Sequence, residues 1–420
     1  MLKTIGLLPG VNLRCYTDRR FKQGCLSVQL VRQMCREEAA MNALLPAVLL
    51  RGSTGAPDLR DITLRLDDLY GASVGTLVRR VGDYQTTGFH CGFIDERFAL
   101  EGDKVLEPMV DFLGELLFEP LLQDGVFCKD YVESEKVNLI SAIESRFNNK
   151  QAYANDLMLE SLCRADSYGV PRLGYPEDVA SVSAEKLYSH YRKILEESPV
   201  ELFYVGSGEP ERVAALLKPM FAHFSGQRLP LPEQTTFRLS EPEDFIKTMD
   251  ISQGKLAMGF VSDVHTNDSR FAAMQICNMI LGGGVTSKLF MHLREKLSLC
   301  YDISSSYHGS KGLLTVGAGI DPENAEKVRG LILEELRACA EGGFTAGELE
   351  AARQALLSSL RGIHDSPGAI EGYYAAAVLS ARFRTPEVLT RELNRVTPEQ
   401  VAEAAATLRL HTVCFLKGVQ

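Results

Sequence analysis

The chain has 420 residues, of which 45% are hydrophobic and 24% are charged, a composition typical of a globular protein with a sizeable core. Its formal net charge is −10 and it contains no basic block, which disfavours a nucleic-acid partner. No apolar stretch approaches the length of a membrane span, so we expect no membrane partner. The length predicts two or three domains.

The ten cysteines stand singly, and none belongs to a C-x-x-C motif. This spacing argues against a zinc ribbon, a thioredoxin-type motif or a disulfide framework, and it favours buried free thiols in a reducing cytoplasm. The eight histidines are dispersed, with no two of them three or four residues apart, so no helix face offers a histidine pair to a metal. Near the start of the chain, Pro9 and Gly10 interrupt a short apolar run, which fits a buried strand better than a secretory signal.

Two halves of the chain show the same order of predicted elements, which indicates an internal repeat. In the first half, an apolar helix, a glycine turn, an amphipathic helix, two later helices, a late helix start and a closing strand fall at 41–50, 51–53, 62–69, 104–117, 129–145, 182–185 and 200–205. In the second half, the corresponding segments are 271–281, 282–284, 289–297, 325–339, 346–361, 396–399 and 412–416. A Thr345-x-x-Glu348 capping box and Pro398 at a first helical position mark two of the helix starts.

A linker is predicted at 226–244, where the residues that break regular structure are Gly226, Pro230, Pro232 and Pro242. We therefore expect homologous domains at 1–225 and 245–420. Each is predicted to be an α+β domain, a strand-rich mixed or antiparallel sheet with helices packed on it.

The segment 281–301 contains the main candidate site. Three glycines end an apolar helix, and Thr286 and Ser287 can cap the next one. Leucines 289, 293 and 297 then recur at a four-residue step and predict a helix face that packs on a core. Arg294 lies at the edge of that face, and Tyr301 begins a polar strand. On residue types alone, an ordinary helix with a solvated arginine and a half-buried tyrosine remains the alternative interpretation.

This segment reads L-G-G-G-x-x-S-x-L-F-x-x-x-R-E-K-x-x-L-x-Y and resembles the second-domain signature of the pitrilysin/insulinase zinc peptidases, the inverzincins. The matching residues are Leu281, Gly282, Gly283, Gly284, Ser287, Leu289, Phe290, Arg294, Glu295, Lys296, Leu299 and Tyr301. The resemblance extends over nearly the whole chain, including the two-domain repeat. It implies one half of a clam-shell fold like that of the mitochondrial processing peptidase.

In this family, a first-domain helix carries H-x-x-E-H and runs into K-G-T. Histidines four residues apart bind zinc, and the glutamate activates the metal-bound water. When the segment 51–53 is aligned with K-G-T, the three motif positions hold Ala43, Pro46 and Ala47. The family's further glutamate ligand, seven residues after the glutamate of an E-R pair, aligns with Ala142. The resemblance thus implies no metal site on this chain.

The resemblance assigns roles to the residues that remain. Tyr301 corresponds to a donor for the oxyanion of the tetrahedral intermediate, and Arg294 to a residue that holds the substrate backbone. Gly282, Gly283, Gly284 and Ser287 correspond to a substrate-binding loop. Because this pair is present and the zinc ligands are absent, we expect a partner chain, a homologue with H-x-x-E-H, to supply the zinc.

Other motifs give weaker signals. The segment 282–288 lacks the G-K-[ST] order of a phosphate loop. Gly206 and Gly208 follow a strand, but Glu211 takes the third glycine position of a dinucleotide motif, so a turn is the better interpretation. A buried thiol is a better interpretation of Cys300 than a nucleophile.

Glu37 and Glu38, at the start of the degenerate helix, are interpreted as its solvated, dipole-favoured first turn rather than as a displaced base. The sequence-based hypothesis is a non-zinc subunit of a heterodimeric zinc peptidase that acts on peptides and is inactive alone. The alternative is a non-catalytic structural or peptide-binding scaffold, possible as a homodimer. A self-sufficient hydrolase with another nucleophile finds no supporting triad.

Overall fold

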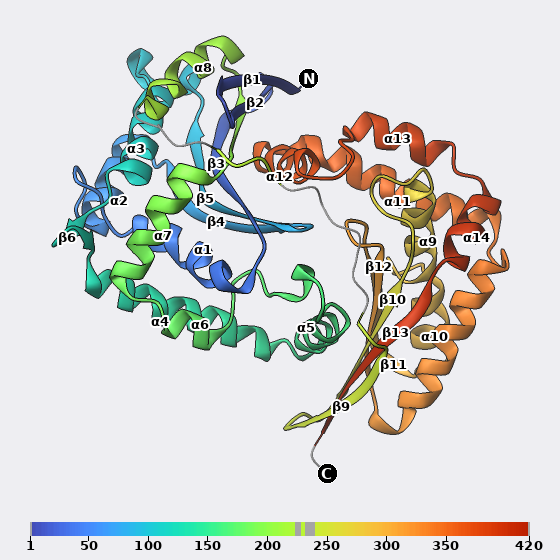
Figure 1. Ribbon diagram of the computed structural model, residues 1–420. Helices are drawn as coiled ribbons and strands as arrows, with labels where there is room; N and C mark the ends of the chain where they lie inside the picture. The colour runs from blue at the N-terminus through green and yellow to red at the C-terminus, as the bar shows by residue number, and fades with distance from the viewer. Residues whose placement is uncertain (1, 223–227, 232–239, 419–420) are drawn as a thin grey trace. The chain divides into compact units, whose positions relative to one another are not determined.

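The computed structural model describes residues 2–222, 228–231 and 240–418, so the predicted linker lies partly outside the described residues, at 226–227 and 232–239. The chain divides into two compact units (Figure 1). Unit 1 comprises Met1–Glu144, Val170–Glu233 and Ile363–Ala376, and unit 2 comprises Ser145–Gly169, Gln234–Gly362 and Ala377–Gln420. Each unit thus includes a segment from the other half of the chain, an exchange that the continuous boundaries 1–225 and 245–420 do not contain.

Unit 1 is built on a mixed sheet, whose strand order is β1-β2-β8-β3-β5-β4. These strands are β1 (Leu2–Leu8), β2 (Val11–Thr17), β8 (Val200–Gly206), β3 (Gln23–Gln33), β5 (Tyr84–Ile94) and β4 (Ser73–Val81). A short hairpin is formed by β6 (Leu122–Gln123) and β7 (Val126–Phe127). The helices are α1 (Arg36–Leu49), α2 (Leu59–Asp68), α3 (Leu106–Phe118), α4 (Lys129–Ser145), α6 (Pro176–Ala180), α7 (Ala184–Glu197), α8 (Pro210–Leu217) and α12 (Pro367–Val378).

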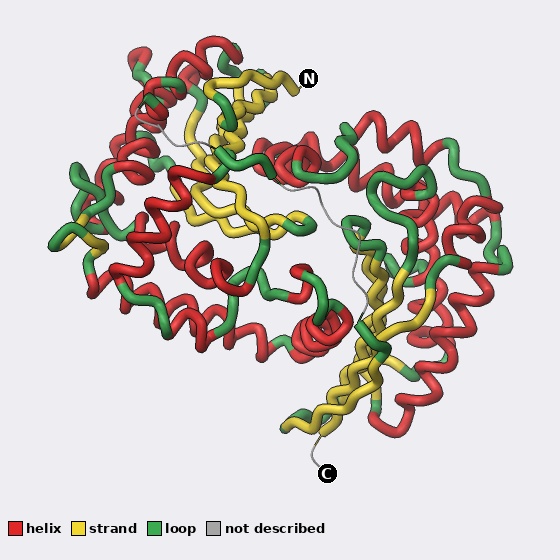
Figure 2. Tube along the Cα trace, viewed as in Figure 1, coloured by secondary structure: helices red, strands yellow, loops and turns green. Residues whose placement is uncertain are grey.

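Unit 2 is built on a second mixed sheet, whose strand order is β11-β12-β10-β13-β9. These strands are β11 (Cys300–His308), β12 (Leu313–Ile320), β10 (Gly254–Val261), β13 (Arg409–Gly418) and β9 (Glu243–Met249). The helices are α5 (Lys150–Leu162), α9 (Phe271–Leu281), α10 (Ala325–Ala340), α11 (Ala346–Gly362), α13 (Pro386–Asn394) and α14 (Pro398–Ala406), with a π-helix at Phe290–Lys296. Figure 1 shows α9, α10 and α14 on one side of this sheet and α5 on the other, and Figure 2 distinguishes strands from helices.

The two sheets repeat one topology. Strands β4, β5, β3, β8 and β2 follow each other in unit 1 as β11, β12, β10, β13 and β9 do in unit 2. In both sheets one corresponding pair, β8 with β2 and β13 with β9, is parallel, whereas the other corresponding pairs are antiparallel. The predicted α+β class and the predicted repeat are therefore confirmed.

Strand β3 shows how the sequence assigns the two faces of the first sheet. Leu26, Val28 and Leu30 are buried in an apolar core that α1, α3 and α7 also line. Ser27 and Gln29 alternate with them and face the opposite side, as the two-residue period of a strand requires. A sheet with one apolar and one polar buried face needs a different set of helices to cover each face.

Helix α12 covers the polar face through one buried carboxylate, Glu371. Its Oε1 accepts hydrogen bonds from Ser27 Oγ at 2.7 Å and from Gln29 Nε2 at 2.9 Å. The Arg79 guanidinium on β4 donates to both carboxylate oxygens, at 2.9 and 2.8 Å. The Glu371 side chain is fully buried, so these hydrogen bonds replace its hydration by water. Burying an isolated carboxylate without such bonds would cost a large free energy.

Helix α5 covers the second sheet where its strands carry small residues. A Cβ at Gly259 on β10 would meet the ends of the Met158 and Leu162 side chains of α5, so glycine lets these buried side chains pack directly on the strand. Gln151 Nε2 also donates to the Leu256 carbonyl oxygen at 3.0 Å. The helix is thereby held by both packing and a backbone contact.

Most of the predicted helices form where the sequence places them. Helices α9 and α4 have the predicted bounds, and the capping box forms, since Glu348 N donates to Thr345 Oγ1 at 3.1 Å. Pro398 occupies the first turn of α14. Helices α5 and α12 were not predicted, and they are the two exchanged helices. Within the described part of the chain, no helix is both long and apolar enough to cross a membrane.

The Glu371 cluster gives a test of how α12 is held. Glu371→Ala should lower the unfolding free energy of unit 1 by about 3 kcal/mol, because it leaves Arg79, Ser27 and Gln29 without their shared acceptor. Urea unfolding followed by circular dichroism measures this loss, with the first transition analysed separately since a chain of two units need not unfold in one step.

The control is Glu403→Ala, which removes an exposed carboxylate on α14 and should change stability by no more than about 0.5 kcal/mol. Equal unfolding curves for the two variants would show that the buried carboxylate does not hold α12.

Candidate functional site

The glycine turn after α9 is shaped by its approach to strand β11. Gly282 N and Gly283 N both donate to the Asn278 carbonyl oxygen, at 3.0 and 2.9 Å, and Ser305 N donates to the Gly282 carbonyl oxygen at 2.8 Å. A Cβ at Gly282 would lie 2.7 Å from Ser305 Oγ, and one at Gly283 would lie 2.7 Å from Met279 Sδ. These two glycines are therefore required by packing within unit 2.

Gly284 differs from its two neighbours. A Cβ there would lie 3.6 Å from Met279 Cε, an ordinary van der Waals distance. Internal packing thus leaves room for a side chain at this position.

The helix that follows is a π-helix at Phe290–Lys296, and this corrects two expectations. Leu289 and Leu293 are fully buried as predicted, but Leu297 is 37% exposed. Its amide donates to the His292 carbonyl oxygen at 3.0 Å, five residues back, and this wider turn rotates Leu297 away from the four-residue face. Ser287 does not cap the helix by its hydroxyl. Its carbonyl accepts from Met291 N at 2.9 Å, while its buried Oγ has no hydrogen-bond partner among the described residues.

Arg294 projects from the π-helix and is 41% exposed. Its guanidinium lies over the Phe290 ring, 4.5 Å from the centroid, and its Nη1 is 3.4 Å from Glu295 Oε1. A half-exposed ion pair of this kind is weak, and stacking on an aromatic ring leaves the planar N–H fork available. Arg294 can therefore donate to a carbonyl or carboxylate without first breaking a buried contact.

Tyr301 lies in an irregularity of strand β11. Cys300 pairs with Ile320 and Asp302 pairs with Gly319, so Tyr301 is the additional residue of a β-bulge. Bulges turn one side chain out of the regular alternation, and Tyr301 is 59% exposed. Its hydroxyl donates to Asp321 Oδ1 at 3.1 Å. This hydrogen bond to an anion raises the pKa of Tyr301, so the phenol keeps its proton at neutral pH and can act as a donor.

Exposed apolar side chains accompany this pair. Val285, Met291 and Leu297 are 68%, 50% and 37% exposed, and with Tyr301 they fall within a single stretch of the chain. Because the stretch also holds Arg294, this part of the sequence of unit 2 carries both exposed hydrogen-bond donors and exposed apolar side chains. This combination is suited to a polypeptide ligand, whose backbone accepts hydrogen bonds and whose side chains include apolar groups.

The positions that align with the zinc motif lie on α1 and α4 of unit 1. Ala43 and Pro46 are buried, Ala47 is half-buried and Ala142 is exposed near the end of α4. Methyl groups and a proline ring cannot bind zinc or take up a proton. Among the residues that the structure describes, no group of three or more His, Cys, Asp or Glu side chains could hold a metal ion.

Pro46 lies inside helix α1 without an amide hydrogen, so the Asn42 carbonyl loses its usual partner four residues on. Thr87 on β5 supplies a donor instead, with its Oγ1 at 2.6 Å from the Asn42 oxygen. The Asn42 side chain donates to Gln85 Oε1 at 2.8 Å, and its Oδ1 lies 2.7 Å from His190 Nε2. Burial lowers the pKa of His190 to about 4, so this imidazole is neutral at pH 7.

Sequence reasoning missed this network, because its members come from separate elements and no spacing connects them. The only local signal is the proline in an otherwise helical segment, which frees a carbonyl that a tertiary donor must meet. The network lies beside the positions that align with the zinc ligands and fixes α1 to the sheet.

The weaker motifs also have structural explanations. Burial raises the pKa of Cys300 to about 11, which keeps it a thiol. Glu38 is not solvated, which corrects the interpretation of the first turn of α1. Burial opposes its ionisation, but hydrogen bonds from Arg32 and Lys193 lower the pKa of Glu38 to about 2. Gly208 N donates to Tyr204 Oη at 2.9 Å, so the turn at this glycine packs on an aromatic ring.

Comparisons with known proteins agree with this arrangement. The sequence profile of the family described as "Peptidase M16 inactive domain" matches residues 181–356. The probable inactive metalloprotease YmfF of Bacillus subtilis is 28% identical over 98% of this chain and 96% of its own length. An uncharacterized zinc protease of the same organism, YmxG, is 22% identical over 75% of this chain and 77% of its own length.

Solved structures show the same fold. A conserved protein from Enterococcus faecalis V583 superposes with a TM-score of 0.92 at 29% identity, over 100% of this chain and 99% of the other. A peptidase M16 inactive domain from Pseudomonas fluorescens superposes with a TM-score of 0.81 at 18% identity, over 100% of this chain and 98% of the other. The fold and the sequence matches define a metalloprotease homologue. Residues 181–356 match the peptidase M16 inactive-domain family, and over nearly its whole length the chain is similar to a probable inactive metalloprotease.

His190 gives a pH-dependent test of the network on α1. The unfolded imidazole has a pKa of about 6.5 and the folded one about 4, so the unfolded chain binds a proton more readily in this range. Stability from the neutral imidazole is fully present above pH 6.5 and is lost as the pH falls toward 4. This one group should contribute a loss of about 2 kcal/mol between about pH 7 and about pH 5.

Urea unfolding at the two pH values measures the change. His190→Gln should remove this part of the pH dependence, since glutamine can keep a hydrogen bond to Asn42 without titrating. The assignment to His190 would be wrong if the variant lost as much stability on acidification as the unchanged protein.

Proposed function

We propose that this chain is the non-zinc-binding subunit of a heterodimeric metallopeptidase that cleaves peptides. In this proposal, a homologous partner carries H-x-x-E-H and the catalytic zinc, and the chain alone is inactive. Tyr301 donates to the oxyanion, and Arg294 donates to the substrate backbone. The observation that carries the proposal is an exposed, protonated tyrosine on a β-bulge, close in sequence to a half-exposed arginine. The same chain has alanine and proline at the zinc-motif positions.

The chemistry follows from where charge develops. In the proposal, the partner's H-x-x-E-H would hold zinc, which would activate water for attack on a peptide carbonyl. The carbonyl oxygen then becomes an anion, and a preorganised donor lowers that barrier. In the proposal, Tyr301 leaves Asp321 and donates to this oxygen instead. Arg294 offers a planar fork to further carbonyls or to a terminal carboxylate. Gly284, which has room for a side chain, leaves space for a peptide backbone to pass.

The cytoplasm is the proposed location. Its support is the chemistry of the ten cysteines, which are thiols rather than disulfides and eight of which are buried. Free thiols are stable in a reducing compartment.

A non-catalytic scaffold, for example a peptide-binding homodimer, is the second candidate. The hydrogen bond from Tyr301 to Asp321 favours it, because a bound phenol needs no substrate to satisfy it. The exposed apolar side chains at 285, 291 and 297 fit a peptide in either case. The two functions differ in whether this chain affects catalysis by a partner.

Assembly is the first test of the heterodimer. The chain and a zinc-bearing M16 homologue from the same genome should co-elute in a sizing experiment as one species of about twice the mass of either chain. A stable pair typically buries about 1,600 Å² of surface, and an interface of this size should hold the two chains together during the experiment. Elemental analysis after mild chelation should find one zinc per heterodimer and none on this chain alone. Separate elution at micromolar concentration would favour the scaffold.

Tyr301→Phe tests the chemistry directly. It removes one hydroxyl and little volume, so folding and assembly should be unchanged. Turnover of an unstructured peptide by the heterodimer should fall about 10²-fold. One oxyanion donor typically raises the rate by roughly 10²–10³, and the lower value is expected because zinc would also stabilise the same oxygen. Arg294→Ala should raise KM as well as lower kcat, because the arginine also contacts bound substrate in this proposal.

The matched control is Tyr70→Phe. Tyr70 Oη also donates to an aspartate, Asp103 Oδ2 at 2.5 Å, but it lies on unit 1 far along the chain from Arg294. This substitution should leave turnover unchanged. If all three variants match the unchanged heterodimer, this chain takes no part in catalysis.

A further inference from the structure

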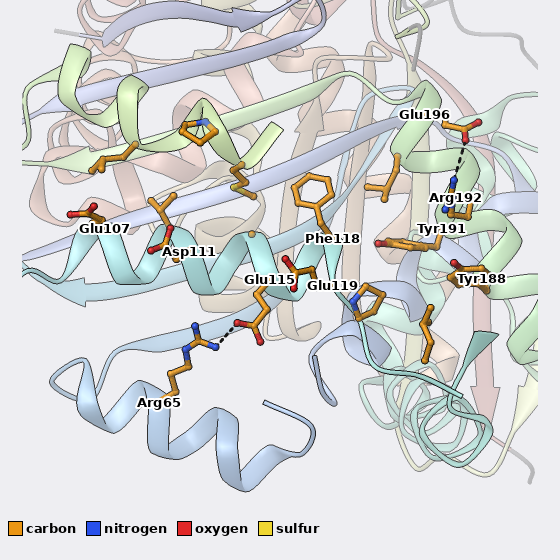
Figure 3. Close-up of a pocket in the computed structure, with 18 of the residues that line it drawn as sticks. Arg65, Glu107, Asp111, Glu115, Phe118, Glu119, Tyr188, Tyr191, Arg192 and Glu196 are labelled. Atoms are coloured by element: carbon orange, nitrogen blue, oxygen red, sulfur yellow. Dashed lines mark hydrogen bonds and ion pairs between the residues drawn. The ribbon is translucent and has the colours of Figure 1, made fainter. Parts of the chain in front are cut away.

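Unit 1 contains a hollow of about 990 Å³ that the peptidase hypothesis does not use. It is formed by α3, α7, α8 and the turn after α8, and Figure 3 shows it with the side chains that line it. Its apolar part includes Phe118, Tyr188, Leu216 and Met220. These side chains are half-buried, so they are held in place by the fold and still offer apolar surface to a ligand.

Helix α3 contributes two parallel rows of side chains to this groove. Residues 107, 111, 115 and 119 are carboxylates at four-residue steps, and Figure 3 shows them along one helix. Residues 110, 114 and 118 form the neighbouring row, which is apolar. Side chains four apart lie on the same face of a helix. The groove therefore has an acidic side next to an apolar floor.

The lining is net negative. Among the described residues that form it, five are carboxylates and two are arginines. Arg65 is already bound to Glu115 at 2.5 Å, Arg192 lies 3.9 Å from Glu196, and Lys104 pairs with Glu107 at 2.9 Å. Asp111 and Glu119 therefore carry the excess negative charge of the lining. Asp111 lies exposed in the middle of the carboxylate row. The groove thus complements a ligand that is positively charged and partly apolar.

The shape of the groove selects among peptide conformations. Its walls are mostly helices, whose backbone hydrogen bonds are internal, and among the described lining residues a strand contributes Leu122 of the two-residue β6. The groove therefore offers an extended peptide little strand edge to pair with. From residue 107 to residue 118, α3 spans roughly 16 Å, enough for about three turns of a second helix lying along it. An amphipathic helix would place apolar residues on the floor and lysine or arginine beside the carboxylate row.

We propose that this groove is a docking site for a basic amphipathic helix of a partner protein. The proposal is independent of the peptidase hypothesis, because none of its residues belongs to the Arg294 and Tyr301 site. A second copy of this chain is a poorer occupant, since each copy carries a net charge of −10. The contact combines apolar burial for affinity with charge for orientation.

The test uses the full chain and a fluorescent 14-residue helical peptide of leucine, alanine and lysine, with lysine on one face. Anisotropy at low salt should show binding, and added salt should weaken it because exposed charges are screened. The same peptide with glutamate in place of lysine should not bind. Asp111→Lys combined with Ala215→Arg should weaken binding at least about tenfold. The first substitution reverses a charge in the carboxylate row, and the second places a cationic side chain in the groove.

Both substituted positions are exposed, so thermal unfolding should be unchanged. The control is Glu334→Lys, which adds a cation at an exposed position on α10 of unit 2 and should leave binding within about twofold. Equal binding to the double variant, or equal binding of the glutamate peptide, would overturn the proposal. A third outcome would also overturn it. If the peptide does not bind, but the unchanged chain self-associates and the double variant does not, then the occupant of the groove is a second copy of this chain.

Discussion

The architecture depends on covering two buried sheet faces with helices that come from the opposite half of the chain. In unit 1 the constraint is one carboxylate. Glu371 accepts hydrogen bonds from Ser27, Gln29 and Arg79 at once, and each of these would lose this acceptor if α12 were absent. Buried polar groups must be hydrogen-bonded, so the polar face of the sheet specifies its partner more narrowly than an apolar face would.

Unit 2 meets the same constraint by different chemistry. Glycine on β10 lets α5 approach closely, and the segment after α5 is fixed by a buried ion pair between Lys311 Nζ and Asp166 Oδ1 at 3.1 Å. Both side chains are almost fully buried, so each charge depends on the other. Because each unit needs a helix from the other half, neither half of the chain is complete as a continuous fragment.

Helix α1 keeps a structural role without the side chains of a metal site. Alanine and proline at the motif positions allow it to pack, and Thr87 compensates for the hydrogen bond that Pro46 removes. The neutral imidazole of His190 completes the contacts of Asn42. Helix α1 can therefore stabilise unit 1 without binding a metal. In our proposals, the functional sites of this chain are Arg294 and Tyr301 in unit 2 and the groove on α3 in unit 1.

Local sequence was sufficient for much of this protein. Hydrophobic periodicity and capping residues predicted α4 and α9, the capping box at Thr345 and the two-domain repeat, because these features depend on neighbours a few residues apart. The resemblance of the motif at 281–301 to the family signature indicated Arg294 and Tyr301. Alignment with the family motif predicted that the zinc ligands are replaced.

The tertiary structure decided what depends on distant partners. Helices α5 and α12 lack a pattern that would reveal which sheet they cover, and folded contacts such as those of Glu371 and Gly259 determine it. The bulge that exposes Tyr301 requires the register of β11 against β12. The groove on α3 requires α7 and α8 beside it. The spacing of residues in the sequence determines which side of a single helix or strand is apolar. Which of these sides pack against each other is decided by packing and by the hydrogen bonds that buried polar groups require.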